Sequence, residues 1–294
     1  MSWARVRQRI ALDLIRWLPK ASYGRAVGFL ARRPLPRSLR ARLYRRFAAR
    51  FGINLDEVER PLDDYPSFDA FFTRQLRSGV RPIDPDPEVV VSPVDGVVVE
   101  SGKVVAGRLI QAKGVDYTLR GLLVDEDMAA RFGGGSYVTL YLAPRDYHRI
   151  HAPADGLVVG YRHIPGAFFP VNPPSVQHVA GLFARNERLV TYLKTPLGRM
   201  AVVKVAATGV GHVTVTYDAQ AQTGRSRRTR RVDYPRPVPI GKGEEMATFH
   251  LGSTVIVLFE HGKVTLASFE RGQRLLLGQP LARRSAARAG DAAA

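Results

Sequence analysis

The stretch FHLGSTVIVLFEHG, residues 249–262, sets a small polar segment directly before an unbroken apolar run. Residues 255–259 are all strand-forming apolar types, and a run of this length predicts a buried β-strand. The Gly252–Ser253 pair in front of it fits an ordinary turn. It also fits a reaction within the chain, because a serine hydroxyl is close to the preceding carbonyl carbon and can attack it once a base removes the proton. The G-x-S-x-G motif is absent here, which gives little support to a serine hydrolase acting on an external substrate.

Short β-rich runs separated by Gly, Pro, Asp or Asn occupy most of the chain from about residue 90 to 270. They predict an α+β protein with a mainly antiparallel β body, sandwich- or barrel-like, preceded by N-terminal amphipathic helices. The runs are VVVSPVDGVVVESGKVV, SYVTLYLA, GLVVGYRHI, ERLVTYLKT, RMAVVKVAA, HVTVTYDA, STVIVLFE and KVTLASFE.

Basic charge is concentrated at the start of the chain, whose formal net charge is +18. Residues 1–50 hold fourteen arginines and lysines but a single acid, Asp13. Apolar residues recur every three or four positions in residues 3–18 and again in 37–51, which predicts two amphipathic helices. We therefore interpret residues 1–60 as a basic amphipathic helical region that associates with an anionic membrane surface. The stripes are Trp3, Val6, Ile10, Leu14 and Trp17, and then Leu39, Leu43, Phe47 and Phe51.

Two other interpretations of this basic region stay open. A helical hairpin packed on the rest of the protein would show the same periodicity, with its arginines in solvent. Nucleic acid binding would also use the positive charge, but the chain has no RNP-like, zinc-finger or helix-turn-helix signature, so we expect no nucleic acid partner. No apolar stretch approaches the roughly 20 residues that a membrane-spanning helix needs.

The rest of the chain divides into a β-rich domain, residues 61–280, and a tail, residues 281–294, that is predicted to be disordered. The domain begins with SFDAFFTRQL, which predicts a short helix capped by Ser67.

Two further stretches carry reactive side chains. SPVDG places Asp95 at a strand end or turn, although Asp-Gly turns are also common without any function. YLAPRDYHRIHAP follows a predicted strand and holds Asp146, His148 and His151. A histidine beside an acidic partner can act as a general base, and purely structural histidines remain the alternative.

The H-x-x-H spacing of the two histidines also raises the question of a zinc hydrolase. The chain has no H-E-x-x-H, and no third ligand stands at motif spacing, so we expect no metal. The chain contains no cysteine, which excludes disulfides, thiolate metal sites and cysteine nucleophiles.

Taken together, these stretches resemble the phosphatidylserine decarboxylases, pyruvoyl-dependent and membrane-associated enzymes of phospholipid synthesis. The resemblance rests on SPVDG, YLAPRDYHRIHAP, GAFFPVNP with LFARNERLV, and KGEEMATFHLGSTVIVLF, in the family's order from about residue 68 to 260. Two segments depart from the family. VAATGVGHVTV, residues 205–215, differs from the usual pattern, which leaves its contact to substrate open. The arginine-rich segment 225–231 is similar to a variable insertion.

The resemblance implies a self-processing proenzyme that converts phosphatidylserine to phosphatidylethanolamine and CO2. It maps Asp95, His151 and Ser253 onto the family's self-processing triad, with His151 as the base toward Ser253 and Asp95 as its orienting partner. The residues alone leave open whether Asp95 or Asp146 partners His151. Cleavage would fall between Gly252 and Ser253.

The resemblance also implies a cofactor made from the chain itself. Ser253 would become a covalent pyruvoyl group that forms a Schiff base with the substrate amine and takes up the electrons released with CO2. His148 matches the other motif histidine and would handle the proton or the departing carboxylate. The β chain, residues 1–252, and the α chain, residues 253–294, would form a heterodimer.

The implied setting is peripheral, on the cytoplasmic face of the cell membrane, where phosphatidylserine lies in an anionic surface. Assembly into a homo-oligomer stays open. The alternative function is a non-catalytic membrane-binding β module whose histidines are structural.

Overall fold

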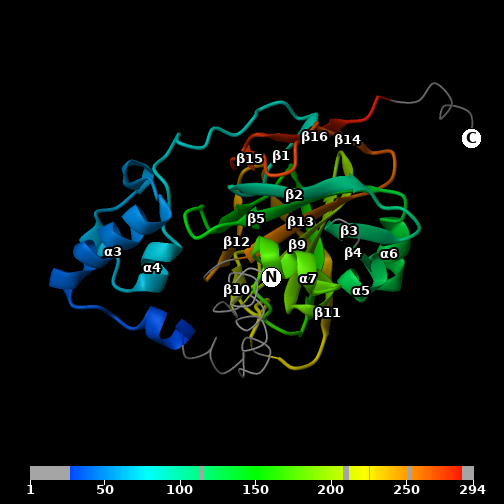
Figure 1. Ribbon diagram of the computed structural model, residues 1–294. Coiled ribbons are helices and arrows are strands. Elements are labelled where there is room, and N and C mark those ends of the chain that lie inside the picture. Colours follow the sequence, from blue (N-terminus) through cyan, green and yellow to red (C-terminus); the bar gives the residue numbers. More distant parts are fainter. Residues whose placement is uncertain (1–26, 113–114, 208–211, 225, 251–252, 287–294) are drawn as a thin grey trace, which may run out of the picture.

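The computed structural model describes residues 27–112, 115–207, 212–224, 226–250 and 253–286. These residues form a small group of helices that stands beside a larger body of β-sheets, and an extended segment joins the two parts (Figure 1). The amphipathic helix predicted for residues 3–18 lies outside the described residues.

The helix predicted for residues 37–51 is confirmed as α3, Arg37–Phe51. It ends at Gly52, which has the left-handed φ of 75° that glycine adopts without a steric cost and that ends many helices. Tyr44 and Ala48 are buried on its inner face. Leu39, Leu43 and Phe51 of the predicted apolar stripe are exposed on its outer face, whereas Phe47 is partly buried against the cluster that contains Tyr44.

The short helix α4, Phe68–Phe72, packs against α3. Ser67 caps it as predicted, because the Ser67 hydroxyl accepts a hydrogen bond from the N–H of Ala70. The rings of Tyr44 and Phe71 stack at 4.5 Å between centroids and form the centre of a small aromatic core. Two 3-10 helices, η1 Leu55–Glu57 and η2 Leu62–Asp64, lie between α3 and α4.

An eight-stranded antiparallel sheet forms the middle of the β body, in the order β11-β7-β8-β9-β13-β5-β2-β15. β13, Ser253–Phe259, lies between β5 and β9 and pairs with both along its length. Val257 belongs to one hydrophobic cluster and Ile256 to another, because successive side chains of a strand face opposite sides. The predicted strand over residues 255–259 is therefore confirmed. The other strands are β2 Gly96–Lys103, β5 Ser136–Leu142, β7 Gly156–Ile164, β8 Arg188–Thr195, β9 Gly198–Ala206, β11 Arg230–Ile240 and β15 Arg274–Leu275.

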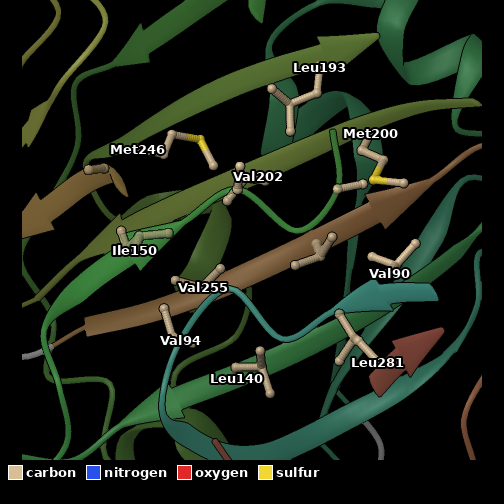
Figure 2. Close-up of a cluster of buried hydrophobic side chains, with 14 of the residues drawn as sticks. Val90, Val94, Leu140, Ile150, Leu193, Met200, Val202, Met246, Val255 and Leu281 are labelled. Atoms are coloured by element: carbon tan, nitrogen blue, oxygen red, sulfur yellow. The ribbon is translucent and has the colours of Figure 1, made fainter. Parts of the chain in front are cut away.

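Smaller elements cover the two faces of this sheet. On one face, Val255 and Leu140 of the large sheet share a cluster with Ile150 and Met246, which come from a three-stranded sheet (Figure 2). Short helices lie over the other face. The three-stranded sheet with Ile150 and Met246 contains β10 Val213–Val215, β12 Glu245–Phe249 and β6 Arg149–His151. A second three-stranded sheet contains β1 Val89–Val91, β16 Pro280–Arg284 and β14 Val264–Leu266, and a separate hairpin contains β3 Arg108–Ala112 and β4 Val115–Thr118. The short helices are α5 Leu119–Leu123, α6 Glu126–Arg131, α7 Pro173–His178 and α8 Leu182–Arg185.

The predicted fold class, a mainly antiparallel β body preceded by helices, is confirmed. The eight-stranded sheet is open, with β11 and β15 at its edges, so the β body is layered and is not a closed barrel. Among the described residues, no helix is long and apolar enough to cross a membrane.

Two parts of the chain differ from the sequence-based expectation. β11 was not predicted, because Pro235, Pro237 and Pro239 argue against a strand. Prolines are tolerated in this strand because it lies at the edge of the sheet. The tail was expected to be disordered from residue 281, but residues 281–284 belong to β16, where Leu281 is buried. Residues 287–294 lie outside the described part, and the boundary near residue 60 stays a prediction.

Candidate active site

Backbone pairing brings the three candidate stretches together. β6 pairs with β12, so that His151 stands opposite Glu245. Toward the end of β12, the N–H of Phe249 donates to the carbonyl of His148 at 2.9 Å. The N–H of His151 donates to the carbonyl of Pro93 in the SPVDG stretch, also at 2.9 Å. Both motif histidines thus lie beside the segment that leads toward residue 253.

Ser253 stands where the chain has passed from one sheet to another. It is the first residue of β13, and its Cα is paired with Leu142 of β5 and Ala206 of β9. β12 ends four residues earlier, at Phe249, in the three-stranded sheet that also contains β6. The Gly252–Ser253 bond therefore directly precedes a strand that is paired on both sides.

His148 is fully buried in the loop that follows β5. Its Nδ1 lies 2.8 Å from the backbone carbonyl of Asp146; because a carbonyl only accepts, Nδ1 carries the ring proton and Nε2 is an acceptor. The ring of Phe72 packs on the imidazole at 4.0 Å between centroids. Burial lowers the pKa of His148 to about 3, and the charge of Arg74 acts in the same direction. His148 is therefore neutral at pH 7.

His151, the last residue of β6, has a different set of partners. Its Nδ1 donates to the carbonyl of Gly243 at 2.8 Å, which leaves Nε2 as the basic atom, 3.4 Å from the Tyr147 hydroxyl. Burial lowers the pKa of His151, whereas the Gly243 carbonyl and the charges of Glu245 and Asp95 oppose that shift. At pH 7 the side chain is thus neutral, and Nε2 is its unprotonated nitrogen.

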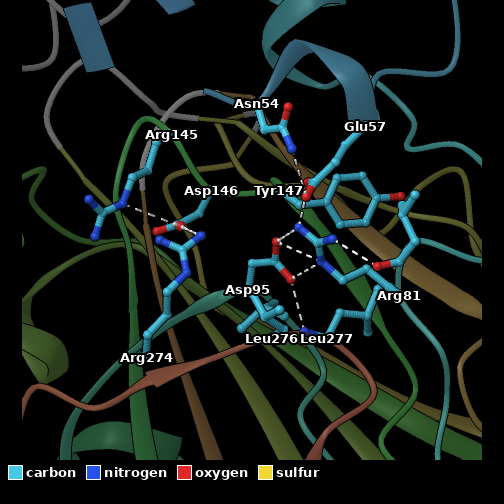
Figure 3. A network of polar contacts seen from close by, with 12 residues as sticks. Asn54, Glu57, Arg81, Asp95, Arg145, Asp146, Tyr147, Arg274, Leu276 and Leu277 are labelled. Carbon is cyan, nitrogen blue, oxygen red and sulfur yellow. Dashed lines mark hydrogen bonds and ion pairs between the residues drawn. The ribbon is translucent and has the colours of Figure 1, made fainter. Parts of the chain in front are cut away.

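Asp95 is buried and held by an arginine that the sequence analysis did not single out (Figure 3). Arg81 donates from Nε to Oδ1 at 2.9 Å and from Nη2 to Oδ2 at 2.7 Å. The N–H of Leu277 donates to Oδ1, and Glu57 accepts a second bond from Arg81. Within the described part of the chain, no hydrogen bond joins Asp95 to His151. Asp95 therefore reaches His151 through its charge and not by direct contact.

Asp146 has partners of its own and does not bind His151 through its side chain either. Its Oδ2 accepts from the N–H of Ala143 at 2.7 Å, and Arg274 lies 3.1 Å from Oδ1 (Figure 3). Burial raises the pKa of Asp146, although these partners oppose the shift. Its backbone carbonyl fixes the ring of His148, so its contribution is to the orientation of His148.

The segment that departs from the family pattern, residues 205–215, has its described residues 212–215 beside the candidate site. Its His212 places its ring 5.0 Å from the ring of His250, and the N–H of His250 donates to the His212 carbonyl at 3.0 Å. His212 of this segment is therefore in contact with His250, which lies three positions before Ser253.

Comparison of the sequence with known proteins assigns the chain to a family. A sequence model of the phosphatidylserine decarboxylase family matches residues 68–283, which include all the stretches described above. The chain belongs to the phosphatidylserine decarboxylase family. Similar relatives are named phosphatidylserine decarboxylase proenzyme. One, from Anaeromyxobacter sp. (strain K), is 52% identical over 279 residues, covering 94% of this chain and 99% of the relative.

Two further relatives of that name extend the likeness along the chain. The protein from Myxococcus xanthus (strain DK1622) is 46% identical over 255 residues, which cover 86% of this chain and 90% of the relative. The protein from Brevibacillus brevis (strain 47 / JCM 6285 / NBRC 100599) is 41% identical over 285 residues, which cover 95% and 99%. Membership of the decarboxylase family does not favour the alternative of a non-catalytic membrane-binding module.

Sequence reasoning missed the residues that surround the predicted ones. Tyr147 stands within the DYHRIH stretch, four residues before His151, and its position was a usable signal. Arg81 and Gly243 carried no such signal, because they reach Asp95 and His151 from distant parts of the chain.

Proposed function

We propose that this chain is a proenzyme that cleaves itself between Gly252 and Ser253 and then decarboxylates phosphatidylserine to phosphatidylethanolamine and CO2. The observation that carries the proposal is the pairing of β6 with β12, which holds His148 and His151 beside the segment leading to Ser253. The family supplies the substrate and the reaction. The roles that we assign to the individual residues come from the family resemblance, and the geometry of the site supports them.

In this proposal His151 is the base for self-cleavage. Its Nε2 takes the proton of the Ser253 hydroxyl, and the oxygen attacks the carbonyl carbon of Gly252. The amide nitrogen leaves as the amine and takes up a proton, so an ester replaces the peptide bond. β-Elimination then releases residues 1–252 with a terminal carboxylate and leaves dehydroalanine at position 253. Addition of water and loss of ammonia convert that residue to the pyruvoyl group.

Asp95 contributes negative charge to this step. When His151 takes up a proton, a nearby carboxylate favours the imidazolium. Arg81 and the Leu277 N–H hold the Asp95 carboxylate in place, and Asp95 is among the groups that raise the pKa of His151. In this proposal the negative charge of Asp95 stabilises the protonated form of His151 from a distance, and no hydrogen bond between the carboxylate and the imidazole is needed.

One polar atom beside the segment that leads to residue 253 fits a group that bears a carbonyl and its substrate. Nε2 of His148 is buried and has no hydrogen-bond partner among the described residues, so it is available to a new group. The pyruvoyl group supplies the electron sink for the carbon that loses CO2.

His148 handles a proton in our proposal. Its imidazole is neutral, so it carries no positive charge with which to pair the departing carboxylate. Because the neutral ring binds a proton only weakly, Nε2 can act as a relay that passes a proton to the carbon that has lost CO2 without storing it.

The outer face of α3 supports docking on an anionic membrane. Leu39 and Leu43 are 53% and 42% exposed, and Arg42, Arg46 and Arg50 are exposed on the same helix. Apolar insertion and the attraction of arginines to anionic lipid would hold the site at headgroup depth. We propose a peripheral location on the cytoplasmic face of the cell membrane.

Intact mass spectrometry of the purified protein tests the central claim. We expect two chains, residues 1–252 and 253–294, the smaller one with a pyruvoyl group and no free α-amino group. Ser253→Ala should stay as one chain and lack activity. A single intact chain in protein that decarboxylates phosphatidylserine would exclude the pyruvoyl mechanism, and chelator-sensitive activity with bound metal would favour a zinc hydrolase.

A further inference from the structure

His250, three residues before Ser253, is held on both ring nitrogens. Its Nδ1 lies 3.0 Å from Oδ2 and 3.2 Å from Oδ1 of Asp69, so Nδ1 donates to that carboxylate. The hydroxyl of Thr214 on β10 lies 3.2 Å from Nε2, and the ring of His212 packs at 5.0 Å. A side chain bound on both nitrogens and on one face has little freedom to move.

The backbone is also fixed on both sides of the cleavage segment. On the N-terminal side, Phe249 and His250 donate their N–H groups to the carbonyls of His148 and His212. On the C-terminal side, Ser253 is paired with two neighbouring strands. Only two residues separate these anchors, so the contacts of residue 250 restrict the chain close to the Gly252–Ser253 bond.

Asp69 does not come from the β body. It lies on α4, the helix whose Phe71 stacks on Tyr44 of α3. The same short helix also places the ring of Phe72 on His148 at 4.0 Å. α4 therefore touches the cleavage segment through Asp69 and a motif histidine through Phe72, while its other side is packed into the N-terminal helices.

We propose that the Asp69–His250 contact positions the scissile segment for self-cleavage and makes cleavage depend on the seating of the N-terminal helices. An attack within the chain needs the hydroxyl oxygen and the carbonyl carbon in near-attack geometry, and small displacements of such groups reduce rates strongly. Asp69 and His250 are positioning residues: they exchange no proton with Ser253. This inference rests on the proposed self-cleavage and adds a control point outside the triad.

The test compares rates of conversion of freshly made precursor into its two chains. Asp69→Ala and His250→Ala should each slow cleavage by roughly 10- to 100-fold. Asp69→Asn should keep most of the rate, because its amide oxygen still accepts a bond from the His250 Nδ1–H. The double variant Asp69→Ala/His250→Ala should be no slower than the slower single variant, because both changes break one contact. Asp116→Ala removes a carboxylate from the exposed Arg108–Asp116 pair on the β3–β4 hairpin and serves as the matched control, with the wild-type rate expected.

The melting temperature, measured in a Ser253→Ala background that cannot cleave, separates positioning from loss of fold. The proposal requires slow cleavage with a melting temperature close to that of the Ser253→Ala parent. Wild-type rates in Asp69→Ala, additive effects in the double variant, or equal slowing by Asp69→Asn and Asp69→Ala would each overturn it. A wild-type protein that never cleaves would contradict the proposed function itself, which is a different result from wild-type cleavage that ignores Asp69.

Discussion

Lys204 on β9 is a fully buried lysine with no carboxylate partner among the described residues. Its ammonium donates to the hydroxyl of Thr191 and to the carbonyl of Val202. Burial lowers the pKa of Lys204 from 10.5 to about 7. The folded protein therefore binds this proton more weakly than the unfolded chain does, and the charged form of Lys204 opposes folding.

The sign of the resulting pH dependence can be tested with Lys204→Met. Between about pH 7 and pH 10.5 the unfolded wild type holds a proton that the folded state lacks, so its free energy of unfolding rises by up to about 1.4 kcal/mol per pH unit. Lys204→Met should remove that slope and stabilise the protein most at pH 7 and below. Urea unfolding from pH 7 to 9 measures it, and the exposed Lys194→Met on β8 is the control. Parallel pH profiles for wild type and Lys204→Met would contradict the assignment.

Arg81 compensates a second buried charge, the carboxylate of Asp95, whose side chain is 1% exposed. We expect Arg81→Ala to lower the free energy of unfolding by about 3–5 kcal/mol, because it leaves a buried carboxylate without its counter-ion. Arg81→Lys should recover only part of the loss, since lysine lacks the two-pronged donor. Glu57→Ala, which removes the more exposed acid bound to Arg81, should cost less. Denaturant unfolding measures all three, and an Arg81→Ala protein as stable as Glu57→Ala would argue against this account.

Among the elements, α3 combines two surfaces on one helix. Tyr44 and Ala48 pack inward, whereas Leu39 and Leu43 remain in solvent beside exposed arginines. Exposed leucines on a basic helix are typical of an interfacial helix, and the inward contacts join that helix to α4. The two sequence-based interpretations, membrane contact and packing on the body, are therefore compatible with each other.

Membrane docking by α3 predicts a specific loss of lipid binding. Changing Arg42, Arg46 and Arg50 to Gln should weaken binding to phosphatidylserine vesicles by up to about 3 kcal/mol, or roughly 100-fold, since each basic residue near such a surface contributes about 1 kcal/mol. Vesicle flotation at low salt measures it. The control changes Arg108, Arg120 and Arg283 to Gln, which removes the same charge from exposed ion pairs elsewhere. Equal losses in both triple variants would show that net charge, and not α3, governs binding.

At the scale of the whole molecule, residues 253–286, which follow the proposed cleavage site, supply strands to two sheets of the β body. β13 is an inner strand of the eight-stranded sheet, and β15 is one of its edges. β14 and β16 pair with each other, and β16 also pairs with β1. Residues 253–286 thus contribute to two sheets and to the main hydrophobic cluster.

This interleaving predicts that the cleaved chains stay together. The chain of residues 253–294 should co-elute with that of residues 1–252 in size-exclusion chromatography under native conditions, because its release would expose the apolar side chains of β13 on both faces of the sheet. Separation should occur only in denaturant. A small chain that dissociates from a still-folded partner in native buffer would contradict this prediction.

Local pattern was enough to predict much of this protein. The apolar run of β13, the periodic helix α3 and the Ser67 cap depend on neighbouring residues, so they can be read along the chain. Motif order pointed to Asp95, His148, His151 and Ser253, whose roles stay predictions. Local pattern failed at β11, where prolines hide an edge strand, and at β16, whose few residues are ordered only by pairing with β1 and β14.

Contacts between distant parts of the chain were decided by the tertiary structure alone. Arg81 donates hydrogen bonds to the Asp95 carboxylate, and the carbonyl of Gly243 accepts one from Nδ1 of His151. The Asp69 carboxylate accepts a hydrogen bond from His250, 181 positions further along the chain. No local rule predicts such partners, because which side chains meet depends on how strands and helices pack and not on their spacing. The reactive residues could thus be named from the sequence, while the groups that set their charge and geometry could be found only in the folded chain.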